Sequence, residues 1–221
     1  TKNGGAGTTT INVAGSNSGT INVTTGIISY SSSSFANTGT INSVSGKKFT
    51  VSGGNFSLNT GSKSTGLGNF ELAGGSVTVN APAATPATAT NYLHSGGTIN
   101  GTGTLQVNGG MDWQLGDIST NVILSSSAVS GKSTGSTGGI QNGVLTNNGA
   151  FTWSGGTITL GNGTFANGGT GVITVTGDNV MNNNFGAHNL ANAGTFTKNG
   201  GAGTTTINVA GSNSGTINVT T

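Results

Sequence analysis

Hydrophobic residues recur along the chain in short runs in which they alternate with polar residues, as in Thr10-Ile11-Asn12-Val13. Alternation with a period of two indicates a strand with one buried side. The runs span only a few residues and are separated by Gly, Asn and Ser, which favour turns. No segment carries the helical period of an amphipathic helix. The pattern therefore predicts an all-β protein built from many short strands.

Two series of residues indicate that the strands recur with a period of about 22 residues. The first is the motif Asn-x-Gly, which suits a tight turn because Asn and Gly tolerate a positive φ. Its members follow one another at nearly regular intervals in two groups, and the gap between the groups fits four further steps of the same size. This structural turn series comprises Asn17, Asn37, Asn59, Asn147, Asn167, Asn192 and Asn213.

The second series consists of aromatic residues that stand four positions before a Gly pair, namely Phe49, Phe70, Tyr92, Phe151 and Phe196. A rung of about 22 residues with three short strands and Gly/Asn corners is typical of a parallel β-solenoid, whose rungs stack about 4.8 Å apart. We therefore predict an all-β parallel β-solenoid, or β-helix, for which the right-handed form is usual. The inward stack is expected to contain Ile11, Val13, Ile21, Val23, Ile41, Phe49, Val51, Phe56, Leu58, Phe70, Leu72, Val77, Val79, Leu105, Val107, Phe151, Trp153, Ile158, Leu160, Val175 and Phe196.

The opening segment of the chain recurs at its other end without one substitution. Residues 1–25 and 197–221 both read TKNGGAGTTTINVAGSNSGTINVTT, at an offset of 196 residues. Chance does not produce an exact match of this length, so we predict a tandem array. Residues 1–196 would form one solenoid unit of about nine rungs, about 43 Å long, and residues 197–221 would begin the next, identical unit. The chain lacks an initiator Met and a signal peptide at Thr1, so we expect an internal or processed piece.

Composition and charge narrow the range of functions. Hydrophobic residues make up 31% of the chain, which is lean for one thick core and fits a narrow apolar interior. Six Lys, no Arg and four acidic residues give a net charge of +2, so there is no basic patch for nucleic acid. No stretch approaches the roughly 20 apolar residues of a membrane helix. The lack of Cys excludes disulfides and thiolate metal sites.

The segment Gly103-Thr104-Leu105-Gln106-Val107 is similar to the G-T-L-x-V strand of autotransporter-type β-strand repeats. Gly19-Thr20-Ile21-Asn22-Val23 and Gly96-Gly97-Thr98-Ile99-Asn100 are looser versions. The whole chain resembles the β-helical stalks of filamentous-haemagglutinin-like and autotransporter-like bacterial surface adhesins. This resemblance implies a secreted, surface-attached or extracellular fibre used in adhesion, cell–cell contact or biofilm matrix.

Asp112 and Asp117 are the only carboxylates that lie close together in the sequence. Polysaccharide lyases and hydrolases built on β-helices place clustered acids along one groove, often with Arg, Lys or Ca²⁺. The other acids, Glu71 and Asp178, lie about two and three rungs away, and the chain has no Arg. We therefore interpret all four as isolated, solvated acids and expect no catalytic residue and no enzyme activity.

Metal and cofactor sites lack their usual residues. The Gly-rich segments 4–8 and 168–172 resemble the calcium-binding repeat G-G-x-G-x-D but have no Asp in the required place. His94 and His188 have no Cys or carboxylate nearby in the sequence, so we expect both to face solvent. We predict that the chain binds no metal and no cofactor.

Lys47-Lys48 is the only basic doublet and is expected to form a solvated corner, with an acidic partner across a fibre contact as the alternative. Thr-x-Thr pairs could form an ice-binding ladder if they stacked on one face. They are irregularly spaced, and Thr is also a good strand residue, so a structural role is favoured. The pairs stand at 8/10, 157/159, 174/176 and 195/197.

Two segments, Ala81–Thr90 and Ser125–Gly139, interrupt the rung pattern. Pro82 and Pro86 fall in the first, and because proline cannot donate to the ladder, this segment must leave the stack or sit at its edge. It is either a tolerated surface loop or a lateral contact between solenoids.

The sequence thus predicts a structural or adhesive segment of a long extracellular or cell-surface fibre, and the resemblance implies a bacterial one. The expected partners are further copies of the same solenoid, along the chain and side by side, and a surface or matrix polysaccharide. A carbohydrate-binding or carbohydrate-cleaving β-helix and an ice-binding solenoid remain the alternatives.

Overall fold

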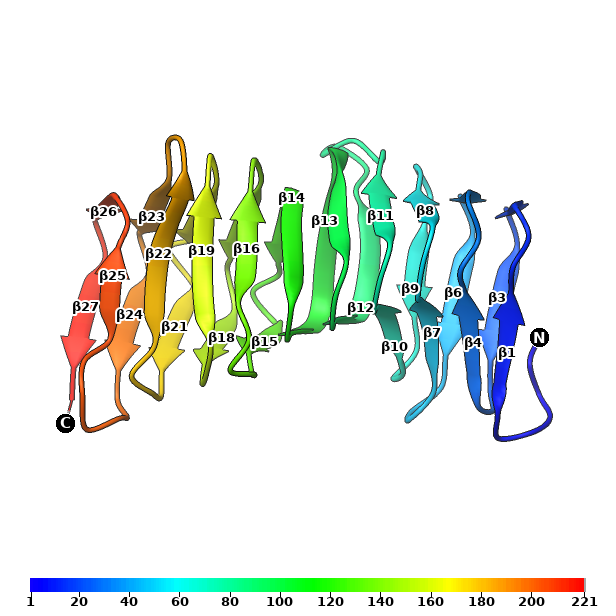
Figure 1. Cartoon of the computed structure of the whole chain (residues 1–221), viewed down its shortest axis with the longest axis horizontal. Coiled ribbons are helices and arrows are strands. Elements are labelled where there is room, and N and C mark those ends of the chain that lie inside the picture. Colours follow the sequence, from blue (N-terminus) through cyan, green and yellow to red (C-terminus); the bar gives the residue numbers. More distant parts are fainter. Residues whose placement is uncertain (221) are drawn as a thin grey trace.

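A computed structural model describes residues 1–220, which contain no helix. The strands join into one continuous 27-stranded parallel sheet that winds around a long axis, with the two termini at opposite ends (Figure 1). No helix able to span a membrane is found in the described part of the chain. The prediction of an all-β parallel solenoid is confirmed.

Each turn has three sides, which we call faces 1, 2 and 3 in the order in which the chain enters them at β1, β2 and β3. Each strand pairs in parallel with the strand on the same face one turn later, as β1 does with β4. Face 1 contains β1 (Thr8–Ile11), β4 (Ile27–Tyr30), β7 (Lys48–Val51), β10 (Asn69–Leu72), the end of β12 (Ala87–His94), the end of β13 (Thr98–Trp113), β15 (Val129–Lys132), β18 (Ala150–Trp153), β21 (Val172–Val175), β24 (Thr195–Lys198) and β27 (Thr216–Val219).

Face 2 contains β2 (Gly15–Asn17), β5 (Phe35–Asn37), β8 (Asn55–Leu58), β11 (Ser76–Val79), the start of β13, the start of β14 (Gly116–Leu124), β16 (Gly138–Gln141), β19 (Thr157–Gly161), β22 (Val180–Phe185) and β25 (Thr206–Asn208). Face 3 contains β3 (Thr20–Val23), β6 (Thr40–Ser43), β9 (Lys63–Thr65), the start of β12, the middle of β13, the end of β14, β17 (Val144–Asn147), β20 (Thr164–Asn167), β23 (Asn189–Asn192) and β26 (Gly211–Asn213).

Turn length varies along the solenoid. The offset between paired residues is smallest between Thr104 and Asn121, in the middle of the chain, and largest between Val180 and Thr206, near its end. Ten turns separate Thr8 from Thr216 on face 1, which gives a mean turn of about 21 residues, within the range of solenoid repeats. The rung is therefore slightly shorter than the sequence spacing predicts.

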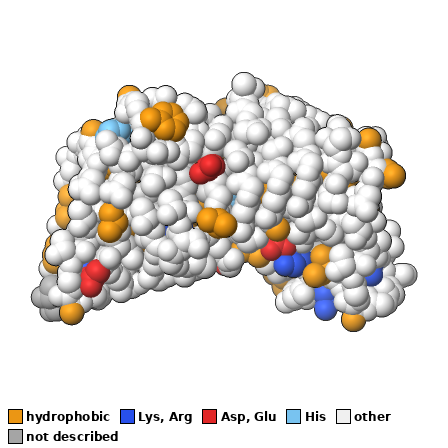
Figure 2. Space-filling view, viewed as in Figure 1, with side chains coloured by type: hydrophobic (Ala, Val, Ile, Leu, Met, Phe, Trp, Pro, Cys, Tyr) orange, Lys and Arg blue, Asp and Glu red, His pale blue; other side chains and the backbone are white. Residues whose placement is uncertain are grey.

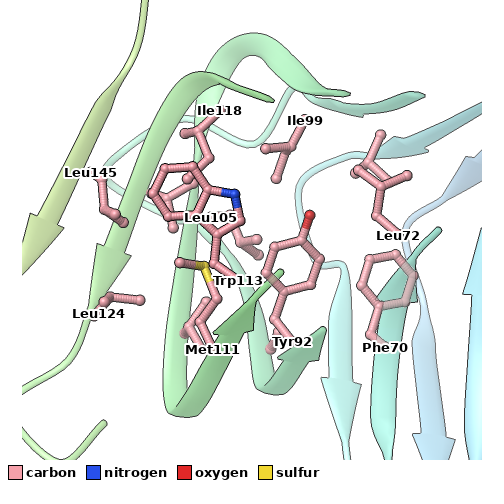
Figure 3. Close-up of a cluster of buried hydrophobic side chains, with 14 of the residues drawn as sticks. Phe70, Leu72, Tyr92, Ile99, Leu105, Met111, Trp113, Ile118, Leu124 and Leu145 are labelled. Atoms are coloured by element: carbon pink, nitrogen blue, oxygen red, sulfur yellow. The ribbon is translucent and has the colours of Figure 1, made fainter. Parts of the chain in front are cut away.

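Side chains from the three faces fill the interior. The aromatic series forms one column on face 1, where the ring centroids of Phe49 and Phe70, and of Phe70 and Tyr92, are 6.1 Å apart. Figure 3 shows this column continuing from Phe70 through Tyr92 to Met111. The predicted inward residues are buried or partly buried except Val13, which is 67% exposed because it lies in the bend between β1 and β2.

The Asn turn series lies in two columns, one on face 2 and one on face 3. On face 2, Asn17 Nδ2 donates to Asn37 Oδ1 at 2.8 Å, and Asn59 lies just after β8, where its Oδ1 accepts from Asn80 Nδ2 at 2.9 Å. The second column is on face 3, and each of its amides donates to the next at 2.6 to 2.9 Å. Its members are Asn147, Asn167, Asn192 and Asn213.

Replacing Asn167 with Ala is expected to destabilise the protein by about 3 kcal/mol, because several buried polar groups lose their partner. Asn167 is 1% exposed, and its Nδ2 donates to Asn192 Oδ1 at 2.7 Å and to the Thr195 carbonyl at 3.0 Å. Asn213→Ala is the matched control, since Asn213 ends the same column and is exposed. We expect it to cost about 1 kcal/mol or less in urea unfolding. Equal losses in the two variants would contradict a buried amide ladder.

The two copies of the duplicated segment lie on different faces at the two ends of the solenoid. β25, β26 and β27 fall in the second copy of the sequence that forms β1, β2 and β3. The first copy occupies faces 1, 2 and 3 in that order, whereas the second occupies faces 2, 3 and 1. The offset between the copies therefore spans nine turns and one further face, which is 28 faces in all. This agrees with the prediction of about nine rungs per unit and adds one third of a turn to it.

The two expected interruptions differ in size from the prediction. The first runs from Asn80 to Pro86 between β11 and β12, and the Thr85 N–H donates to the Pro82 carbonyl at 2.9 Å, which closes a turn at this corner. Both prolines thus lie outside the ladder, as expected. The segment Ser125–Gly139 is only partly irregular, because it includes β15 and the start of β16. Its small Ser and Gly residues still allow backbone pairing with neighbouring turns.

Candidate functional sites

Asp112 and Asp117 do not form a common site. Asp112 is on the outer side of face 1, where Gln114 Nε2 donates to it at 2.7 Å and Ser133 Oγ also donates. Asp117 is on face 2, where its backbone pairs with Gly139, and burial raises its pKa. Because a corner separates the two carboxylates, they are not placed to share general acid and base roles.

Glu71 is not a solvated acid, and Lys48 is not a solvated corner. Glu71 is 5% exposed and forms an ion pair of 2.7 Å with Lys48. Thr50 Oγ1 and Ser95 Oγ also donate to the carboxylate, at 2.7 and 3.0 Å. Burial by itself would raise the pKa of Glu71, but these hydrogen bonds and the charge of Lys48 hold it below its ordinary value. The carboxylate is therefore a structural link between three neighbouring turns.

His94 was expected to face solvent but is 0% exposed. It occupies the last inward position of its turn on face 1, where its ring lies 5.6 Å from that of Tyr92 and Nε2 is 3.4 Å from the Gly97 carbonyl oxygen. Burial lowers its pKa to about 4, so the ring is neutral near pH 7. His188 is partly exposed beside the Gly186 carbonyl. Within residues 1–220, no cluster of three or more His, Asp and Glu side chains could hold a metal ion.

The structure reveals two lysines in the interior that the sequence interpretation missed. Lys132 is 0% exposed, and its Nζ donates to the carbonyls of Gln114 and Thr134 at 2.8 and 3.2 Å. Burial lowers the pKa of Lys132, while the charge of Asp112 opposes this shift. Lys198 is 8% exposed, donates to the Gly200 carbonyl at 2.6 Å and pairs with Asp178 at 2.9 Å.

Both lysines occupy the inward position that Trp113 and Trp153 occupy in other turns. Each Trp donates its Nε1–H to a carbonyl three residues later, that of Gly116 at 3.2 Å and that of Gly156 at 3.1 Å. The lysines and tryptophans at this position share one role, because their side chains donate hydrogen bonds to the carbonyls of the corner that follows face 1. A donor side chain two residues after the inward aromatic position, followed by a Gly-containing corner, is the sequence signal for these residues.

A shallow groove of about 330 Å³ lies on face 1 where two turns separate. Met111 and Ser130 are not paired through their backbones there, and the Met111 N–H donates instead to Ser130 Oγ at 2.9 Å. Its polar side chains include those of Asn69, Asn91 and Asp112. Figure 2 shows the molecule hollowed on the corresponding lower side, between its two halves. Tyr92, the aromatic residue of the lining, is 1% exposed and so offers no stacking surface.

Both ends of the solenoid expose apolar residues. At the C-terminal end, Leu190, Phe196, Ile207 and Ile217 surround an apolar hollow of about 340 Å³. At the N-terminal end, Ile11, Ile21 and Ile28 lie beside residues 1–4. An uncovered sheet end is a template for further strands.

Comparison with known protein families, curated proteins and solved structures gave no significant match for this chain.

Proposed function

We propose that this chain is a structural segment of a long extracellular or cell-surface fibre in which tandem units continue one β-solenoid. The observation that supports this most strongly is the unbroken duplication of residues 1–25 at 197–221, whose two copies lie in one parallel sheet. A solenoid satisfies its backbone polar groups by stacking, so it gains stability with every added turn. The role is mechanical, and the partners are the continuing chain and neighbouring fibres.

The adhesive role and the bacterial cell surface are proposed from the resemblance to β-helical surface adhesins. The loop that carries Pro82 and Pro86 is proposed as a lateral contact, since it stands out from one corner (Figure 1). In a tandem array it would recur every 28 faces and thus point in three directions in turn. A matrix polysaccharide is a further proposed partner.

The alternatives have weaker support. An ice-binding surface needs a continuous Thr ladder, but Lys48, Glu71 and Asp112 interrupt the outer side of face 1 in the first half of the solenoid. The rotation by one face would also move any such ladder around the axis in the next unit. A carbohydrate-cleaving groove would need paired acids, and the face 1 groove contains Asp112 as its one carboxylate.

Antibodies raised against the purified protein and applied to intact producing cells are expected to label thin filaments outside the cell in electron micrographs. Cells that lack the gene provide the control. Labelling confined to the cell interior, or to discrete particles, would contradict the proposal. Thermal hysteresis or polysaccharide cleavage by the purified protein would favour the corresponding alternative.

A further inference from the structure

Identical residues have very different exposures in the two copies of the duplicated sequence. Val23 is 0% exposed, whereas its copy Val219 is 67% exposed. Ile21 is partly buried, and its copy Ile217 is 59% exposed. Because the sequences are the same, we attribute the difference in exposure to the following turn, which covers Ile21 and Val23 in the first copy but has no counterpart over Ile217 and Val219.

The first copy shows this cover. Residues 26–45 form β4, β5 and β6, which lie in parallel register on β1, β2 and β3. The register places Ile41 beside Ile21 and Phe35 beside Gly15. The hydrophobic residues of the cover that are buried in the apolar interior are Ile28, Tyr30, Phe35 and Ile41.

Polar contacts also match between the first copy and its cover. Asn17 Nδ2 donates to Asn37 Oδ1 at 2.8 Å, and Asn42 Nδ2 donates to Asn22 Oδ1 at 3.1 Å. In the second copy, Asn213 keeps the bond within its own turn, from Nδ2 to the Gly215 carbonyl at 3.2 Å, as Asn17 does to Gly19 at 3.3 Å. The end of the solenoid thus presents the same amide in the same local geometry.

The second copy shows which polar contacts join the duplicated segment to the turn before it. Lys198 pairs with Asp178 at 2.9 Å, and the Gly203 N–H donates to the other oxygen of the same carboxylate at 2.9 Å. Lys198 Nζ also donates to the Gly200 carbonyl two residues later, at 2.6 Å. Lys2, the copy of Lys198, makes the same local bond, from Nζ to the Gly4 carbonyl at 3.2 Å. The two copies together therefore describe both sides of one junction.

We propose that the C-terminal end of the solenoid is a docking surface for a segment with the sequence of residues 26–45, supplied by the next unit and rotated by one face. This inference rests on the proposed tandem fibre and names the segment that joins its units. β25, β26 and β27 would receive it as β1, β2 and β3 receive β4, β5 and β6. The hollow around Phe196 and Ile217 would then become part of the continuous interior.

A single-cysteine experiment tests this, because the chain has no Cys of its own. Val219→Cys is made in the full chain, in a chain extended after position 221 by the sequence of residues 26–45, and in one extended by the same residues in scrambled order. The rate of maleimide labelling under native conditions is measured for each. Val23→Cys in the unextended chain is the matched control, because position 23 corresponds to position 219 in the duplicated sequence and is fully covered.

The native extension is expected to slow labelling at position 219 by at least about tenfold, toward the rate at position 23, because a buried thiol reacts only after local opening. The scrambled extension is expected to leave the rate unchanged. Equal rates with both extensions, whether fast or slow, would overturn a sequence-specific docking surface. Protection by the native extension without fibres on cells would retain the docking surface and reject the proposed function.

Discussion

Replacing Trp153 with Ala is expected to destabilise the solenoid by about 4 kcal/mol, which lowers the melting temperature by about 10 °C for a chain of this size. Trp153 is 0% exposed and lies between Lys132 and Val175 of the adjoining turns. The interior is only one narrow stack, so neighbouring turns cannot collapse into the cavity without losing their own pairing. The substitution also leaves the Gly156 carbonyl without the indole N–H that donates to it at 3.1 Å.

Thr152→Ala is the matched control for this prediction. Thr152 is next to Trp153 in β18 but points outward and is exposed. We expect a change within about 0.5 kcal/mol, as for other surface substitutions. Differential scanning calorimetry of the two variants measures both changes. A loss at position 152 as large as that at position 153 would contradict the assignment of inner and outer sides on face 1.

Lowering the pH from 7 to 4 is expected to remove about 3 kcal/mol of stability through His94 alone. The pKa of His94 is lowered by burial to about 4 in the folded protein, compared with 6.5 for an unperturbed His. Between these values the unfolded state binds a proton that the folded state does not. The contribution of the neutral ring is therefore fully present above pH 6.5 and is lost as the pH falls toward 4.

His94→Gln is the control, because Gln is neutral throughout this range and keeps a side-chain donor. Urea unfolding at pH 7, 5.5 and 4 should show a decline in the parent protein that the variant lacks. Glu71 also loses its contribution in acid, but only below its ordinary pKa, because its folded pKa is lowered. Asp117 acts in the opposite direction, since its pKa is raised. The same pH dependence in the parent and the variant would contradict a buried, neutral His94.

Much of the fold could be predicted from the sequence because the solenoid repeats one simple pattern. Alternation in segments such as Phe49-Thr50-Val51 gives the inward and outward sides, and the aromatic column on face 1 has the expected neighbours Phe49, Phe70 and Tyr92. The local geometry of each turn can therefore be predicted from the residues of that turn.

The one-face offset could not be predicted from spacing. The gap between Asn59 and Asn147 fits four turns of the length that the sequence spacing predicts, but it also fits four turns and one face at the shorter mean turn of the structure. Turn length also varies widely from one place in the solenoid to another. Four turns, and four turns and one face, can therefore be distinguished only from the strand pairing in the structure.

The buried polar residues were hidden from sequence reasoning for a different reason. Burial of Lys132 or His94 is unfavourable unless the polar atoms find partners. Those partners are backbone carbonyls of the corner that follows face 1, such as that of Gly97, and they can be assigned only once the position two residues after the inward aromatic column is known to point inward. Asp112 and Asp117 are close in sequence, but a corner lies between them, so the two carboxylates do not form a pair.

The continuity of the solenoid from unit to unit is tested directly by cryo-electron microscopy of a chain in which residues 1–196 are repeated three times and followed by residues 197–221. We expect a rod with a spacing of about 4.8 Å between turns, in which successive units are related by a rise of about 45 Å and a rotation of about 120°. Units related by the rise alone, with no rotation, would contradict the junction described above. Separate globular particles would contradict the continuous solenoid itself.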